Sequence, residues 1–178
     1  MRTWLLQDFD RANTIFHQSL GIPFVQIPWT PAHLRVLEPH TDCNGASKTP
    51  GKRLKYVGMG GFVSFPGYIK YWHYQLPDEF ARLVPIHVGE RVAPEITIAI
   101  MPELTHCFLK QRVDNQAAVA SMNRRRATDP RLQDCELLHA HQIEERAIRD
   151  VTIWIDTKSN LWADLISRGK LEEFERLA

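Results

Sequence analysis

The hydrophobic pattern of this chain changes its period near Pro77, and that change limits the folds open to it. The residues before Pro77 favour extended structure, because turn residues separate short runs in which apolar and polar positions alternate. Strands are expected there at 33–42, 55–65 and 68–75. Pro66-Gly67 separates the last two runs, which therefore read as the arms of a hairpin.

After Pro77, helical and extended periods alternate. Helices are expected at 88–101, 115–122, 131–148 and 162–177, and strands at 105–113 and 151–155. Pro94 must kink the first of these helices or lie within its first turn. The order predicts an α/β fold of α+β-like order: a five-stranded mixed sheet, its first three strands antiparallel, flanked by helices.

The length of 178 residues suits one well-buried domain with an appendage. Residues 3–19 have apolar positions at helical spacing, and residues 23–31 read as an extended, turn-rich connector. We therefore expect an N-terminal helix and connector at 1–32 and the main domain at 33–178.

Composition excludes several classes of protein. Pro or charged residues interrupt every apolar run before the roughly 18 residues that a membrane span needs, so no membrane partner is expected. The N-terminus lacks the pattern of a secretory signal peptide. Cys43, Cys107 and Cys135 are odd in number and form no CxxC pair, which favours free thiols over disulfides or a zinc site. An intracellular location, in the cytoplasm or nucleus, is expected.

The net charge of +1 hides an uneven distribution. Residues 42–75 and 104–131 are basic, and the second segment contains Arg124, Arg125 and Arg126 in succession. Basic segments of this kind suit a polyanionic partner such as nucleic acid. Charge alone also fits a solvated surface, which is the commoner reason for such a pattern.

Four carboxylates stand where an acid is costly unless it has a role. Asp42 and Asp114 end predicted strands, Glu90 lies near the start of a predicted helix, and Asp164 lies in the first turn of the closing helix. Clustered carboxylates repel one another, and a hard divalent cation removes that cost. Taken singly, Asp114 and Asp164 also fit as helix N-terminal residues, and Asp42 as a turn residue. The set of four on these elements favours a metal site.

The motifs around these acids carry a resemblance to a known family. They read HTDCNG, GMGGFV, IHVGERVA, RVDNQAAVA and NLWADLISRG. The chain resembles the ribonuclease H superfamily over roughly residues 34–170, and more narrowly the ribonuclease H domains of retroelement reverse transcriptases of the DIRS type. Residues 3–19 resemble the end of the preceding polymerase segment.

The resemblance implies a ribonuclease H-like fold and endonucleolytic hydrolysis of the RNA strand of RNA–DNA hybrids with two Mg²⁺ ions, or Mn²⁺ in their place. Asp42, Glu90, Asp114 and Asp164 would be the catalytic metal ligands. Glu95 is the alternative to Glu90, although the family pattern I-x-x-x-E matches Ile86 to Glu90. The implied substrate-binding residues are Asn44, Asn115, Gln116, Arg124, Arg125 and Arg126.

The RNA–DNA hybrid is thus the expected partner, together with the polymerase domain of a reverse transcriptase. The start of the chain suggests a truncated or decayed copy of such an enzyme. Two alternatives stay open: a catalytically silent module of this fold that binds nucleic acid or serves as a scaffold, and a DNA-cutting member of the superfamily. Sequence predicts no oligomeric state.

Overall fold

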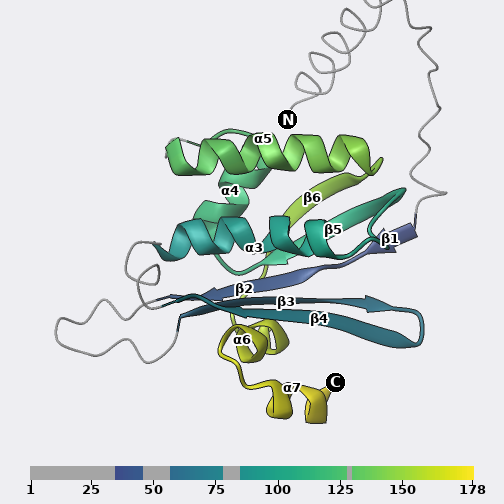
Figure 1. Cartoon of the computed structure of the whole chain (residues 1–178), viewed down its shortest axis with the longest axis vertical. Helices are drawn as coiled ribbons and strands as arrows, with labels where there is room; N and C mark the ends of the chain where they lie inside the picture. The colour runs from purple at the N-terminus through teal and green to yellow at the C-terminus, as the bar shows by residue number, and fades with distance from the viewer. Residues whose placement is uncertain (1–34, 46–56, 78–84, 128–129) are drawn as a thin grey trace, which may run out of the picture. The chain divides into compact units, whose positions relative to one another are not determined.

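The computed structural model describes residues 35–45, 57–77, 85–127 and 130–178, all within one compact unit. The helix predicted at 3–19 and the predicted boundary between 1–32 and 33–178 lie outside the described residues. A six-stranded mixed sheet occupies the centre of this unit (Figure 1). Its strands are β1 (Arg35–Leu37), β2 (His40–Asn44), β3 (Gly58–Phe65), β4 (Tyr68–Gln75), β5 (Cys107–Val113) and β6 (Arg149–Trp154).

The pairing of the strands confirms the predicted mixed sheet. Strands β2, β3 and β4 are antiparallel neighbours, whereas β5 runs parallel to β1, β2 and β6. The crossovers that return the chain to parallel strands contain helices, as parallel pairing requires. The carboxyl ends of β2 and β5 therefore point toward the same edge of the sheet.

The first predicted strand, 33–42, is divided in two, which gives six strands instead of five. Both parts pair with β5 in one register, with Arg35 opposite Cys107 and His40 opposite Arg112. The break falls at Pro39, which has no N–H to donate to a neighbouring strand. The carbonyl of Pro39 still accepts a hydrogen bond from the backbone N–H of Arg112 at 2.8 Å. The strand path thus continues through the break.

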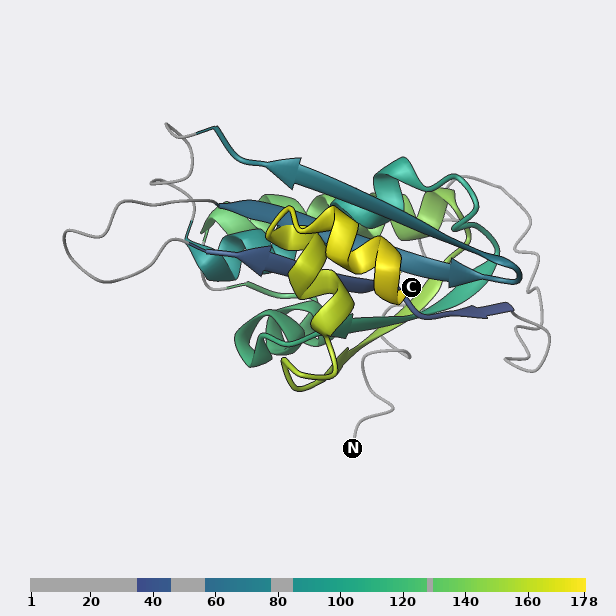
Figure 2. The same cartoon turned by 90° about the horizontal axis from the view of Figure 1, so that it is seen from below.

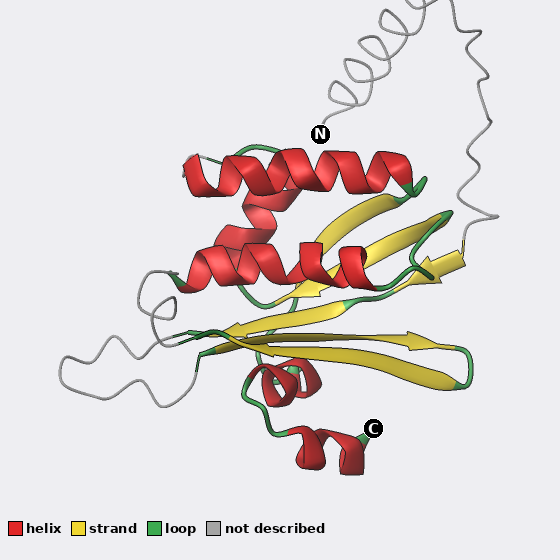
Figure 3. Cartoon of the chain, in the orientation of Figure 1, coloured by secondary structure: helices red, strands yellow, loops and turns green. Residues whose placement is uncertain are grey.

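Helices cover both faces of the sheet. Figures 1 and 3 show α3, α4 and α5 on one face and α6 and α7 on the other, and Figure 2 views the second face directly. The helices are α3 (Ile86–Ile100), α4 (Gln116–Arg124), α5 (Pro130–Glu145), α6 (Leu161–Ser167) and α7 (Leu171–Leu177). Within the described residues, no helix has the length and apolar character to span a membrane.

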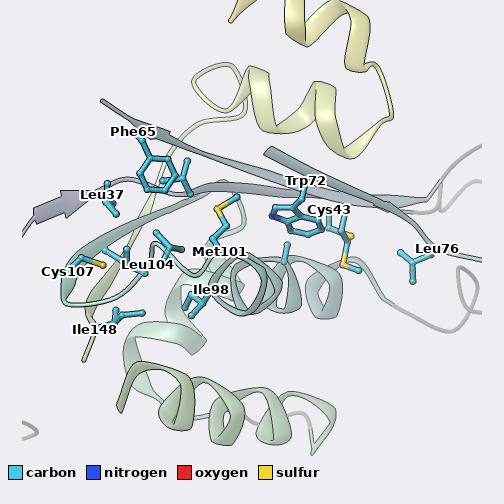
Figure 4. Packing of buried hydrophobic residues seen from close by; sticks show 14 of the residues in the cluster. Leu37, Cys43, Phe65, Trp72, Leu76, Ile98, Met101, Leu104, Cys107 and Ile148 are labelled. Atoms are coloured by element: carbon cyan, nitrogen blue, oxygen red, sulfur yellow. The ribbon is translucent and has the colours of Figure 1, made fainter. Parts of the chain in front are cut away.

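Two apolar clusters fix these layers. The larger lies between the sheet and α3 (Figure 4) and includes Val63, Trp72, Ile98 and Leu109. The smaller packs α6 and α7 against β3 around Phe62, Ile166 and Phe174. Burial of these side chains holds both helix layers against the sheet, because each buried aliphatic or aromatic side chain contributes about 1.5–3 kcal/mol.

The closing helix predicted at 162–177 is in fact two helices. Gly169 has a φ of 69°, a left-handed conformation that an α-helix cannot continue through. Its N–H donates to the carbonyl of Ile166 at 2.9 Å, and Lys170 donates to Leu165, which closes the end of α6. Pro94 lies inside α3 beyond the first turn, which excludes one of the two positions expected for it.

The buried face of α5 is largely polar, where its sequence pattern predicts an apolar side that includes Leu138. Leu138 is 50% exposed, while Glu136, His139 and Gln142 are buried. His139 is fully buried, and its two ring nitrogens lie 2.7 Å from a carboxylate oxygen of Glu95 on α3 and 3.1 Å from one of Asp150 on β6.

Arginines complete this buried network. Arg91, also fully buried, binds Glu95 and lies 2.9 Å from Glu136 through its Nε. On the other side of the network, Arg125 pairs with Asp150. The two carboxylates beside His139 raise its pKa above the ordinary value despite burial, and His139 in turn holds the pKa of Asp150 low. Ion pairs therefore join α3, α5, β6 and the end of α4.

We predict that His139→Leu lowers the free energy of unfolding by about 3 kcal/mol near pH 6, because it removes the charged partner that Glu95 and Asp150 share in the buried network. Since the folded-state pKa of His139 is raised, its contribution is complete below pH 6.5 and is lost as pH rises through the folded pKa. The difference between wild type and variant in urea unfolding should therefore shrink from pH 6 to pH 9. His141→Leu, on the exposed side of α5, is the control. A difference in the free energy of unfolding that stays constant with pH would contradict the raised pKa of His139.

Candidate metal centre

Two carboxylates come from neighbouring parallel strands. Asp42 lies in β2 and is 5% exposed, and Asp114 directly follows β5, where the chain turns into α4. The strand pairing that places His40 opposite Arg112 also brings Asp42 level with Asp114. The side chain of Thr157 hydrogen-bonds Asp114, whose carbonyl accepts the indole N–H of Trp154 at 3.0 Å.

The third carboxylate, Glu90, comes from α3, and a glycine allows that helix to approach β2. Gly89 faces Cys43, and a Cβ at this position would lie 2.2 Å from the Cys43 Sγ. Only a residue without a side chain fits there. Glu90 follows directly in the helix and is 3% exposed, with the backbone of Cys43 as a hydrogen-bond partner.

Asp42, Glu90 and Asp114 each place one carboxylate oxygen within 4.8 Å of the oxygens of the other two. Oε2 of Glu90 is buried and has no hydrogen-bond partner among the described residues. A buried, unpartnered carboxylate oxygen beside two further carboxylates fits the oxygen-ligand chemistry of Mg²⁺ or Mn²⁺. The structure thus brings three of the four predicted ligands together.

The electrostatics of the three groups agree with this geometry. Burial, followed by the charges of Asp42 and Asp114, raises the pKa of Glu90 from 4.5 to about 9. Burial also raises the pKa of Asp42 from 3.8 to about 6, opposed by a hydrogen bond from Ser167, and shifts that of Asp114 upward. Without a cation, the three carboxylates therefore resist ionising together.

The fourth predicted ligand, Asp164, stands beside this group rather than within it. Its charge contributes to the raised pKa values of both Asp42 and Asp114, so it faces the same site. Its carboxylate is paired with Arg168, one helical turn later, at 2.7 Å. The role of Asp164 as a metal ligand stays a prediction.

Glu95, the alternative to Glu90, points elsewhere. Its carboxylate binds Arg91 and His139 in the buried network described above. The two glutamates are five residues apart and so lie on different sides of α3. The structure therefore groups Glu90, and not Glu95, with Asp42 and Asp114.

The predicted substrate-binding residues take varied positions. Asn44 ends β2, and Asn115 caps α4 by accepting the backbone N–H groups of Ala117 and Ala118 at 3.0 and 3.1 Å. Gln116 opens α4 and is exposed. Arg124, Arg125 and Arg126 are exposed at the end of α4, but Arg125 is paired with Asp150. The positions of these six residues do not test whether they bind the substrate, so their roles stay a prediction.

Sequence reasoning missed two polar residues that hold α6 against β2. The side-chain amide of Asn160 donates to the carbonyl of Thr41 at 2.9 Å, and the hydroxyl of Ser167 donates to Oδ2 of Asp42. Both residues belong to the NLWADLISRG motif, so the signal was present. Their partners lie over a hundred positions away, which sequence alone did not indicate.

No protein-family model and no curated protein matches the chain. Solved structures do match it. LC11-RNase H1, isolated from compost by a metagenomic approach, has a TM-score of 0.58 at 20% identity, covering 76% of this chain and 96% of that one. The same protein in complex with an RNA/DNA hybrid gives 0.51 at 19% identity, with 76% and 98% covered. The foamy viral protease-reverse transcriptase in complex with RNA/DNA hybrid gives 0.50 at 16% identity, covering 82% of this chain and 22% of that one.

The chain has a ribonuclease H-like fold. This confirms the predicted fold class, from a likeness in structure at a low level of sequence identity. The narrower resemblance to DIRS-type retroelements stays a prediction.

We predict that Gly89→Ala destabilises this ribonuclease H-like domain by about 1–3 kcal/mol, the usual cost of overpacking. In an unconstrained helix the same change would stabilise by about 1 kcal/mol. Because the added Cβ would meet the Cys43 Sγ, the double variant Cys43→Ala/Gly89→Ala should recover part of the loss. Urea unfolding of the two single variants and the double variant measures the coupling free energy between Cys43 and Gly89. Purely additive effects would contradict the proposed contact.

The raised pKa values predict how pH affects the metal-free protein. Folded Glu90 and Asp42 bind protons more tightly than in the unfolded chain, so the free energy of unfolding should fall as pH rises from about 4 to about 9. Each group contributes a slope of at most about 1.4 kcal/mol per pH unit. Glu90→Gln should flatten this decline and unfold at a higher temperature than wild type in EDTA at pH 8.

Addition of Mg²⁺ or Mn²⁺ at pH 8 should raise the unfolding temperature of wild type far more than that of Glu90→Gln. Thermal unfolding followed by circular dichroism, with and without EDTA, measures both effects. Equal responses of the two proteins to metal would exclude Glu90 from the site.

Proposed function

We propose that this domain hydrolyses the RNA strand of RNA–DNA hybrids endonucleolytically, with two divalent metal ions, as the ribonuclease H part of a retrotransposon reverse transcriptase. The observation that carries the proposal is the convergence of Asp42, Glu90 and Asp114, with Asp164 beside them. The fold supports it, because the three carboxylates come from two neighbouring parallel strands and the helix that covers them.

The donor set fits the proposed metals. Asp42, Glu90 and Asp114 offer only carboxylate oxygens, and burial leaves Oε2 of Glu90 in need of a partner. When bound, Mg²⁺ ions supply an activated water and neutralise charge that develops on the phosphate oxygens. Asp164 would be a direct ligand of the other metal ion, as the family resemblance implies.

The residues around the site have separate tasks in this proposal. Asp42 and Glu90 would hold the metal ions through their buried carboxylates, and Asn115 keeps the start of α4 fixed beside Asp114 through its two backbone hydrogen bonds. Arg124 and Arg126 are exposed and suit phosphate oxygens of the nucleic-acid backbone. Asn44 and Gln116 are proposed to contact the sugars that distinguish RNA from DNA.

The comparison structures support the proposed substrate and context. LC11-RNase H1 has been solved with an RNA/DNA hybrid, and so has the much longer foamy viral protease-reverse transcriptase. A domain of this fold therefore occurs both as a separate chain and as part of a reverse transcriptase. We propose the polymerase domain of such an enzyme as the covalent partner of this domain.

The test compares the cleavage of three substrates: end-labelled RNA–DNA hybrid, duplex DNA and single-stranded RNA, each with Mg²⁺, Mn²⁺ or EDTA. We expect metal-dependent cuts within the RNA strand of the hybrid alone. Asp114→Asn should reduce the rate by about 100-fold or more, the scale expected when one preorganised charged group is lost. Asp134→Asn, which changes an exposed acid of α5, should cleave like wild type.

Other outcomes separate the alternatives. Metal-dependent cutting of duplex DNA would identify a DNA-cutting member of the fold. Hybrid binding without cleavage by wild type would identify a silent binding module. Either result would overturn the proposed activity.

A further inference from the structure

We propose that Ser167 is a positioning residue of the metal centre, which holds the Asp42 carboxylate in the orientation that binds the cation. This inference rests on the proposed function, because it assigns Asp42 as a metal ligand. Ser167 lies in α6, on the opposite face of the sheet from the helix that carries Glu90.

The contact between the two residues is enclosed. Ser167 is fully buried, Asp42 is 5% exposed, and the hydroxyl of Ser167 donates to Oδ2 of Asp42. The same hydroxyl lies 3.0 Å from the backbone carbonyl of Asp164, the fourth predicted ligand. A hydrogen bond from a neutral donor to a carboxylate is stronger than one between neutral groups, so Asp42 is the preferred acceptor.

Close packing of α6 on the sheet places this donor beside Asp42. Gly60 pairs directly with Asp42 in the sheet, and a Cβ on Gly60 would lie 2.9 Å from the backbone nitrogen of Ser167 and 2.5 Å from Cγ2 of Ile166. The other end of the helix is anchored by Asn160, whose amide binds the carbonyl of Thr41. Two successive residues of β2 are therefore held by the two ends of α6.

The need for such a residue follows from the crowding of the site. The charges of Asp114 and Asp164 act on Asp42, and a free carboxylate would turn away from them. No ion pair to Asp42 is present among the described residues, since Arg168 binds Asp164 instead. The hydroxyl of Ser167 is thus the neutral group that fixes the carboxylate plane without competing with a cation for its charge.

The experiment measures metal binding in the absence of nucleic acid. Mn²⁺ is titrated calorimetrically into the full chain at pH 8, for wild type, Ser167→Ala and the control Ile166→Val, which loosens the packing of α6 but keeps the hydroxyl. We expect Ser167→Ala to bind Mn²⁺ about 10–100-fold more weakly, the usual cost of removing a partner that orients a metal ligand. Ile166→Val should bind like wild type.

A second variant covers the case in which Ser167→Ala does not fold. Ser167→Cys keeps nearly the same volume and offers only a weak donor, so it should also weaken Mn²⁺ binding. Wild-type affinity in either folded Ser167 variant, or an equal loss in Ile166→Val, would overturn the inference, as would absence of Mn²⁺ binding to wild type.

Cleavage of labelled hybrid by the same proteins keeps this result apart from the proposed activity. Weaker Mn²⁺ binding by Ser167→Ala, with no hybrid cleavage by wild type, would support the role of Ser167 and overturn the nuclease. Hybrid cleavage by wild type, with unchanged Mn²⁺ binding by Ser167→Ala, would support the nuclease and overturn the role of Ser167.

Discussion

Mutual repulsion among buried carboxylates is the constraint on which the rest of this structure depends. Three acids with oxygens within 4.8 Å of one another resist ionising together, because burial and mutual repulsion both raise their pKa values. The three carboxylates stay close together because the helices on both faces pack tightly against the strands. Gly89 lets α3 contact β2, and Gly60 lets α6 contact the opposite face of the same strand pair. The absence of two side chains thus determines how closely the charged ones approach.

Helix α3 takes part in two electrostatic systems that must remain separate. On one side, Glu90 adds a third carboxyl group to Asp42 and Asp114, and no arginine pairs with it among the described residues. On the other, Glu95 is neutralised by Arg91 and His139, deep between α3 and α5. Removing a partner from such a buried network is costly, so the network fixes the rotation of α3 about its axis. This rotation places Glu90 on the side of α3 that faces Asp42. The pairs on the far side of the helix therefore help to set the geometry of the metal centre.

The sequence predicted those features that depend on local pattern. Strand ends, the mixed sheet and the positions of Asp42 and Asp114 follow from periodicity and turn residues, and the structure places both acids together. What depends on distant partners could not be predicted. The polar side of α5 reads as a solvated face until Glu95 and Asp150 are seen to meet His139 there. The prediction of a single closing helix was wrong for a local reason: Gly169 adopts a left-handed conformation that ends α6, although the apolar pattern continues beyond it.

The buried network also limits how the basic segment after α4 can meet a polyanion. Arg125 adopts a left-handed backbone conformation, with a φ of 52°, and its guanidinium is tied to Asp150, which His139 holds from behind. A phosphate that bound Arg125 would compete with Asp150 for the guanidinium. Arg124 and Arg126 are exposed, and no ion pair engages either within the described part of the chain. Neither arginine would therefore lose an ion pair when it binds a phosphate. In the proposed function, Arg125 therefore anchors the loop, and Arg124 and Arg126 are the arginines that would contact phosphate.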